Sequence, residues 1–322
     1  MSEATLGLNI LEQIKNPEKY RFLATLAEDY PEIAKKVAER IPMWSQRVDA
    51  AFKLEGYADQ ILQKMEYRTR KDELAFCQEV ATQIITDLEA NPNKKICFIQ
   101  WGTRGSEPYF HKLILEKISP DLRKRIVIPS GNEKFRMLKN DPNIHVYYID
   151  DSANSGKQMY QSIVSTFKHT VDGNRTADIP FTAFLMGMTD EAKDTIAPFL
   201  KNNLKAQETH EDNGTSHRLV WQVPENQTRA EFNFSPTPTM YDAVDSLIEQ
   251  GKIKKEDEGK FLIDAHHNFN VGTLLLFYHR LLQDNVAAIF KTGRLSDSLK
   301  EEHGIEPLFE GFEEVNAYDS HL

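Results

Sequence analysis

The chain has 322 residues, of which 40% are hydrophobic and 27% are charged, and its formal net charge is −10. This length allows one large or two modest domains with a buried core, and the composition is that of a soluble globular protein. The negative charge argues against general binding to nucleic-acid phosphates. The sequence has no apolar run of membrane-spanning length and no basic-then-apolar signal layout, so we expect a cytoplasmic protein that does not bind membranes.

Residues 1–90 have apolar side chains at helical spacing. Pro17, Pro31 and Pro42 interrupt this pattern, and we expect them to start or stop helices. Residues 1–66 carry no chemical motif, so we interpret them as an N-terminal helical region. It could serve as a cap over a site, as the contact of a homodimer, or as a surface for another partner.

The two cysteines of the sequence are Cys77, in a helical pattern, and Cys97, in a strand pattern. Two cysteines in such patterns are typical of buried thiols. We therefore predict neither a disulfide framework nor a zinc site.

From Lys95 onward the sequence alternates between strand-like and helix-like segments. We predict strands at 96–100, 126–128, 145–149, 181–188 and 217–223, and helices at 108–118, 133–138, 157–169 and 191–204. This order predicts an α/β fold, a mostly parallel central sheet with helices on both faces, preceded by the N-terminal helical region. Ligands of such sheets bind at the carboxyl ends of strands, near the point where the strand order reverses.

The most informative stretch is Val146–Met159, VYYIDDSANSGKQM. A buried strand leads into Asp150 and Asp151, a polar turn follows, and a helix is expected from Lys157. The free N–H groups of a helix N-terminus favour an anion, and two carboxylates can hold sugar hydroxyls or a metal. The stretch thus predicts a site for a phosphorylated, hydroxyl-bearing ligand. The alternative is an ordinary surface turn without a ligand, because Asp, Ser, Asn and Gly are common in turns.

An apolar strand, two acids, a small turn and Ser-Gly resemble the ribose-phosphate loop of type I phosphoribosyltransferases. The resemblance implies that Asp150 and Asp151 bind the ribose hydroxyls of phosphoribosyl pyrophosphate together with Mg²⁺. It also implies that the turn binds the 5-phosphate through Ser152, Ala153, Asn154, Ser155, Gly156, Lys157 and Gln158.

A second turn, Trp101–Ser106 (WGTRGS), follows the first predicted strand. Glycines in it permit close backbone approach, and its Arg104 offers two parallel donors to an anion. The family has a small pyrophosphate-binding loop at the equivalent place, which implies that Thr103, Arg104 and Gly105 contact pyrophosphate. The catalytic residues implied are Arg104, Asp150 and Asp151. An ordinary turn with an arginine in solvent is the alternative.

Two positions depart from the family pattern. Several nucleobase-using members have a catalytic Asp where this chain has Asn154, and a second hydroxyl residue where it has Gln158. Because Asn is a poor proton acceptor, a second hypothesis is a sensor or effector that binds a nucleotide or phosphoribosyl ligand without transfer. A P-loop enzyme is a weaker third hypothesis, because Asp151 and Gln158 stand where that loop needs Gly and Ser or Thr.

Two later segments, Val220–Thr228 and Leu274–Phe290, are similar to motifs of divergent phosphoribosyltransferase-like domains from bacterial conflict systems. His279 and Asn285 are the residues of the second motif that clearly remain. We interpret Asp264–Asn270 as a polar structural loop, although Asp264, His266 and Asn268 could instead line an acceptor site.

The predicted domains are the helical region at 1–66, a phosphoribosyltransferase-like domain at 67–295, and an acidic tail at 296–322. We expect the tail to be a solvated extension, as acidic termini usually are. It also resembles the secretion signals of some bacterial effector proteins, although that likeness is weak.

Overall fold

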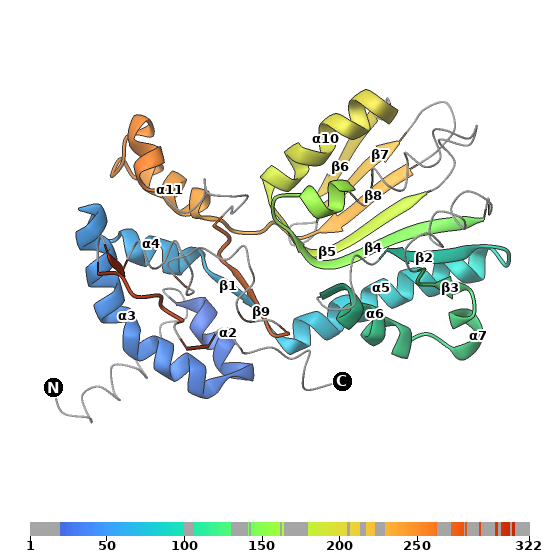
Figure 1. Cartoon of the computed structure of the whole chain (residues 1–322), viewed down its shortest axis with the longest axis horizontal. Helices are drawn as coiled ribbons and strands as arrows, with labels where there is room; N and C mark the ends of the chain where they lie inside the picture. The colour runs from blue at the N-terminus through green and yellow to red at the C-terminus, as the bar shows by residue number, and fades with distance from the viewer. Residues whose placement is uncertain are drawn as a thin grey trace. The chain divides into compact units, whose positions relative to one another are not determined.

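The computed structural model describes residues 20–99, 106–129, 141, 143–161, 163, 180–204, 207–212, 217–222, 229–262, 272–279, 281, 290, 300–301, 304–309 and 311–312. The chain divides into two compact units (Figure 1). The first, here called the helical unit, combines Met1–Asp72 with Thr237–Leu322, and the second, called the sheet unit, comprises Glu73–Pro236. The domain boundaries drawn from the sequence after residues 66 and 295 stay predictions.

The sheet unit is built on a seven-stranded sheet. In spatial order its strands are β3 (Ile126–Val127), β2 (Lys95–Ile99), β4 (Ile144–Ala153), β5 (Phe181–Met188), β8 (Arg229–Phe234), β7 (His217–Gln222) and β6 (Gln207–Asp212). The strands from β3 to β8 are parallel, whereas β7 and β6 pair antiparallel with their neighbours. The predicted α/β fold with a mostly parallel sheet is confirmed.

Helices lie on both sides of this sheet (Figure 1). On one side is α10 (Asp190–Leu204), and on the other are α5 (Arg70–Ala90) and α6 (Ser106–Glu116), which is followed by the short α7 (Pro120–Arg123). The helices bury the central strands on both faces, and β4 and β5 are accordingly buried along almost their whole length.

Strand β4 is longer than its apolar run predicts. It continues to Ala153 because β5 pairs with it as far as Met188. Asp150 and Asp151 therefore lie inside the strand, and the turn begins at Asn154. The expectation that both acids follow the strand is wrong by four residues, since backbone pairing with β5 outweighs the low strand propensity of Asp.

The sequence pattern does not predict β6 and β8. Strand β6 covers Gln207–Asp212, between the predicted helix at 191–204 and the predicted strand at 217–223. The polar residues Glu231 and Asn233 alternate with Phe232 in β8. Such strands form because a neighbouring strand supplies their hydrogen bonds, and here β7 pairs with both β6 and β8.

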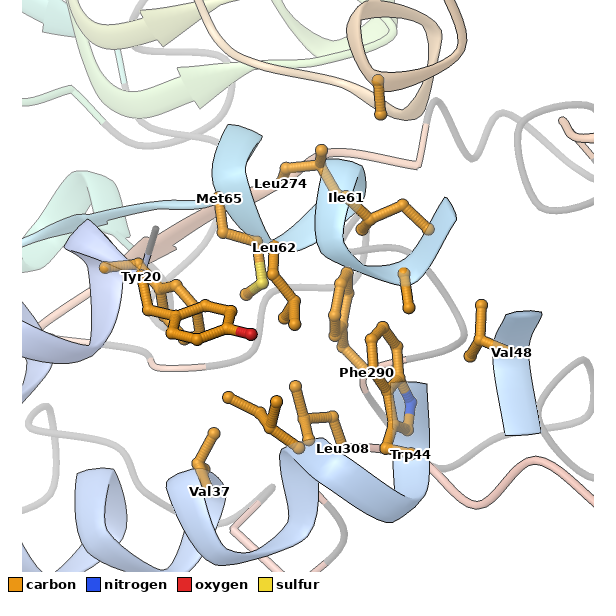
Figure 2. Packing of buried hydrophobic residues seen from close by; sticks show 14 of the residues in the cluster. Tyr20, Val37, Trp44, Val48, Ile61, Leu62, Met65, Leu274, Phe290 and Leu308 are labelled. Carbon is orange, nitrogen blue, oxygen red and sulfur yellow. The ribbon is translucent and has the colours of Figure 1, made fainter. Parts of the chain in front are cut away.

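The helical unit combines helices from both ends of the chain. It contains α2 (Arg21–Asp29), α3 (Pro31–Phe52), α4 (Tyr57–Lys64), α11 (Met240–Glu249), the 3₁₀ helix η1 (Lys255–Lys260), and the parallel strands β1 (Glu66–Arg68) and β9 (Leu275–Phe277). Figure 2 shows the core of this unit, where the rings of Trp44 and Phe290 stack with centroids 5.6 Å apart.

One expectation for this part of the chain is corrected. Pro31 begins α3 as predicted, but Pro42 lies inside that helix and does not end it. The helix continues because its buried face, which includes Ile41 and Trp44, packs into the core on both sides of the proline. Tyr67 of β1 is buried.

The acidic tail is not a solvated extension where the structure describes it. Ile305, Leu308 and Phe309 are buried in the core of the helical unit (Figure 2 labels Leu308). The backbone N–H of Phe309 donates to the carbonyl of Phe290 over 2.9 Å. Three apolar side chains among the acids are enough to anchor the segment, because burying each of them stabilises the fold by about 1.5–3 kcal/mol.

Both cysteines are free and fully buried, as the sequence predicts. Among the described residues, the structure contains no helix of the length and apolar character that crossing a membrane requires.

Candidate functional site

The strand order of the sheet reverses between β2 and β4. After β2 the chain forms β3 on one side of β2, and it returns to form β4 and then β5 on the other side. Ligands of open α/β sheets bind at the carboxyl ends of strands beside such a reversal. The sequence singles out the segments at the ends of β2 and β4. Of the first, Thr103, Arg104 and Gly105 lie outside the described residues, and Ser106 begins α6.

Asp150 is held by three hydrogen bonds near the end of β4. The hydroxyl of Ser106 and the backbone N–H of Asp151 donate to Oδ1, the latter over 2.9 Å. The hydroxyl of Tyr148 donates to Oδ2 over 2.8 Å. The bond from Ser106 joins the start of α6 to the acid on β4.

A third acid, Glu107 in the first turn of α6, belongs to this cluster. Glu107 and Asp150 are both buried, with 4% and 5% of their surfaces exposed. Burial raises the pKa of Asp150 well above its usual value, and the charges of Asp151 and Glu107 raise it further. The negative charges of these carboxyl groups repel one another, and a bound cation or hydroxyl donors would reduce that repulsion. Sequence reasoning missed Glu107, although its place directly after a glycine-containing turn was a usable signal.

Two side-chain hydrogen bonds link the acid cluster to the turn after β4. Ser152 donates to Oδ1 of Asp151 over 3.3 Å, and Nδ2 of Asn154 donates to the hydroxyl of Ser152 over 3.1 Å. Asn154 is buried, and no donor in the described part of the chain reaches its Oδ1.

Gly156 fixes the turn against α10. It has a φ of +68°, a conformation that favours glycine, and a Cβ at this position would lie 2.7 Å from the carbonyl oxygen of Ala192. Thr189 holds the same turn, because its backbone N–H donates to Ala153 over 3.1 Å and its hydroxyl donates to the carbonyl of Asn154. The glycine that the sequence assigns to phosphate binding is thus also required for packing.

The residues after this glycine are helical at 157–161 and 163, as the sequence predicts for the start of this helix. Lys157 is exposed. The side-chain amide of Gln158 donates to Oε1 of Glu107 over 2.9 Å. Gln158, one of the predicted phosphate contacts, is therefore engaged with an acid of α6.

The fit of the cluster to Mg²⁺ depends on its carboxyl groups. Within the described residues, no group of three or more His, Cys, Asp or Glu side chains is arranged to hold a metal ion. Two neighbouring carboxylates nevertheless suit Mg²⁺, which proteins usually bind through one or two carboxylates together with phosphates of the substrate. Asp150 and Asp151 meet this requirement only in combination with a phosphorylated ligand.

A separate groove of about 510 Å³ lies between α5 and the strands β5 and β8. Its lining combines side chains of α5, such as Gln78 and Thr82, with Phe184 and Glu231 of the sheet. None of the predicted site residues lines it, and we consider the acid cluster the better candidate because several titratable groups converge there.

The acid cluster therefore unites Asp150 and Asp151, which the sequence predicts, with Ser106 and Glu107 of α6. Its described side chains offer mainly hydrogen-bond acceptors. A comparison of the chain with protein-family models, with curated proteins and with solved structures found no match.

Proposed function

We propose that the chain binds phosphoribosyl pyrophosphate or a related ribose-phosphate ligand, as type I phosphoribosyltransferases do. The observation that carries the proposal is the position of Asp150 and Asp151 at the carboxyl end of β4, beside the reversal of strand order. The hydrogen bond from Ser106, the residue that follows the predicted pyrophosphate contacts in the sequence, to Asp150 supports the proposal.

In this proposal Asp150 and Asp151 accept hydrogen bonds from the ribose hydroxyls, and the backbone of 152–158 binds the 5-phosphate. Thr103, Arg104 and Gly105 bind pyrophosphate. A bound Mg²⁺ would neutralise the pyrophosphate charge. In a transfer reaction the bond between the anomeric carbon and pyrophosphate breaks, and a bond from that carbon to an acceptor nucleophile forms. The protein residues position the ligand and stabilise the developing charge.

A second candidate function is binding without transfer, as a sensor or effector. The arrangement around Gln158 favours it, because its amide is directed to Glu107 rather than left for a ligand phosphate. Asn154 favours it as well, since an amide cannot serve as the general base that an Asp provides.

Thermal-shift and calorimetric titrations with phosphoribosyl pyrophosphate, with and without Mg²⁺, test the binding. We expect Mg²⁺-dependent stabilisation that is lost in Asp150→Asn and Asp151→Asn. Asp121→Asn is the matched control, because Asp121 is a highly exposed acid on α7. Retained binding in both site variants would refute the placement of the site.

A pyrophosphate-release assay with a panel of nucleobases then separates the two candidates. Release of pyrophosphate supports a transferase, whereas stabilisation without release supports the sensor. Tight ATP binding without any effect of phosphoribosyl pyrophosphate would instead support the P-loop hypothesis.

A further inference from the structure

The groove between α5 and the sheet follows one stripe of the helix. The α5 residues that line it are Ala75, Gln78, Glu79, Thr82, Gln83 and Thr86. Steps of three and four residues place these side chains on one helix face, and all of them are exposed to solvent. From the first of these residues to the last the helix rises by about 16 Å. The groove is therefore long, and a ligand can enter it from solvent.

Two carboxamide groups of the lining turn their nitrogens toward carboxylates of the protein. Nε2 of Gln83 donates to Oδ1 of Asp87 over 3.1 Å, and Nδ2 of Asn233 donates to Oε1 of Glu231 over 3.4 Å. Because a carboxylate only accepts hydrogen bonds, these contacts determine the orientation of both amides. Each amide keeps its carbonyl oxygen as an acceptor for a ligand.

The threonines of the lining have also given up their hydroxyl hydrogens. The hydroxyl of Thr82 donates to the backbone carbonyl of Gln78 over 2.8 Å, and that of Thr86 donates to the carbonyl of Thr82 over 2.9 Å. The oxygen of Thr82 in turn accepts from Nε2 of Gln78 over 3.4 Å. Both threonine oxygens, and the carbonyl oxygen of the Gln78 side chain, remain acceptors.

The charge of the groove points in the same direction. None of the described residues that line it is Lys, Arg or His. Glu231 forms an ion pair with Arg218 of β7 over 2.7 Å, whereas Glu79 adds an exposed carboxylate. An anion would meet mainly acceptor oxygens here. The lining instead suits a cation with several N–H donors, and Phe184 and Ala75 offer apolar contacts beside them.

We propose that this groove binds a linear aliphatic polyamine, whose ammonium groups donate to the acceptor oxygens along α5. Aliphatic amines are charged at neutral pH, as lysine is. Their methylene segments separate the donors along an extended chain, which matches the stripe on the helix. The volume of about 510 Å³ is that of a small-molecule site. The groove shares no residue with the acid cluster, so this inference does not depend on the proposed function.

Calorimetric titration of the full chain with spermidine tests the inference. We expect wild type to bind spermidine and Gln78→Lys to weaken binding by about three- to tenfold, because it places a like charge in the groove. Gln78 is exposed and Lys is a good helix former, so this variant should fold. Gln63→Lys, at an exposed position of α4 in the helical unit, changes the net charge equally and should leave the affinity unchanged.

Hexaamminecobalt(III) is the matched probe, because it has the charge and the N–H donors of spermidine in a compact shape. We expect it to bind at least about threefold more weakly, since it reaches fewer of the acceptors along the helix. Equal affinity for the two cations would overturn the inference. Absence of spermidine binding to wild type, an unchanged affinity in Gln78→Lys, or equal losses in the two lysine variants would overturn it as well.

Discussion

Gly156 packs its backbone directly against Ala192 in the first turn of α10, where a Cβ on the glycine would lie 2.7 Å from the Ala192 carbonyl oxygen. We expect Gly156→Ala to lower the free energy of unfolding of the sheet unit by about 2–4 kcal/mol. The loss combines a left-handed backbone conformation with overpacking against main-chain atoms. Urea denaturation followed by circular dichroism measures it.

Gly251→Ala is the matched control for this prediction. Gly251 has a φ of +70°, close to that of Gly156, but a Cβ there would meet no atom within 4 Å. Its replacement should cost only the backbone strain, about 1–2 kcal/mol. Equal losses in the two variants would contradict a specific steric role for the contact with Ala192.

His111 makes the stability of the sheet unit sensitive to pH. It is 1% exposed against the ring of Phe98, and burial lowers its pKa to about 3. The unfolded chain binds a proton at His111 below a pH of about 6.5, whereas the folded chain does not until about pH 3. Stability is therefore lost as pH falls through this window, by about 2 kcal/mol between pH 7 and pH 5.

Replacing the imidazole tests this directly. His111→Phe should remove about 2 kcal/mol of the stability loss between pH 7 and pH 5. Some pH dependence of the stability should remain in this variant, because burial also lowers the pKa of His145. Denaturation curves of wild type and variant at both pH values give the comparison, and an identical pH dependence would argue against a neutral buried His111.

Asp87 of α5 organises a partly buried polar cluster beside β4. Its Oδ2 accepts from Tyr147 over 2.6 Å and from Lys94 over 2.7 Å, and it lies 3.4 Å from Nδ1 of His145. Burial acts to raise the pKa of Asp87, but hydrogen bonding with His145, Lys94 and Tyr147 outweighs it, and the pKa is lowered.

Tyr147→Phe should cost about 1.5–3 kcal/mol of stability, because it removes a hydrogen bond to a charged group. In an Asp87→Asn background the same substitution should cost clearly less, since the charge is gone. A double-mutant cycle by urea denaturation measures this coupling. Additive losses would show that the hydroxyl and the carboxylate contribute independently.

Phe309 tests the role of the acidic tail. It is fully buried in the helical unit, with its ring 6.3 Å from that of Phe290. Phe309→Ala should therefore cost about 3–5 kcal/mol. Met43→Ala, at a side chain of α3 that is 53% exposed, is the control and should change stability by less than about 0.5 kcal/mol. A neutral Phe309→Ala would restore the interpretation of this segment as a solvated extension.

The sequence by itself determined those features of the protein that depend on residues close together in the chain. Alternating apolar segments predict the parallel strands, because buried strands and the helices that cover them leave a repeated pattern. The same pattern locates Asp150 and Asp151 near the end of the central strand. Cys77 and Cys97 are predicted correctly as buried thiols for the same reason.

Only the tertiary structure decided the features that depend on a distant partner. β4 extends through both acids because β5 pairs with it, and β8 forms because β5 and β7 flank it. Glu107 joins the acids because α6 begins beside the end of β4. Phe309 is buried because a core made from both ends of the chain receives it. Pairing and burial are non-local, so the identity of a residue does not reveal them until its partner is in place.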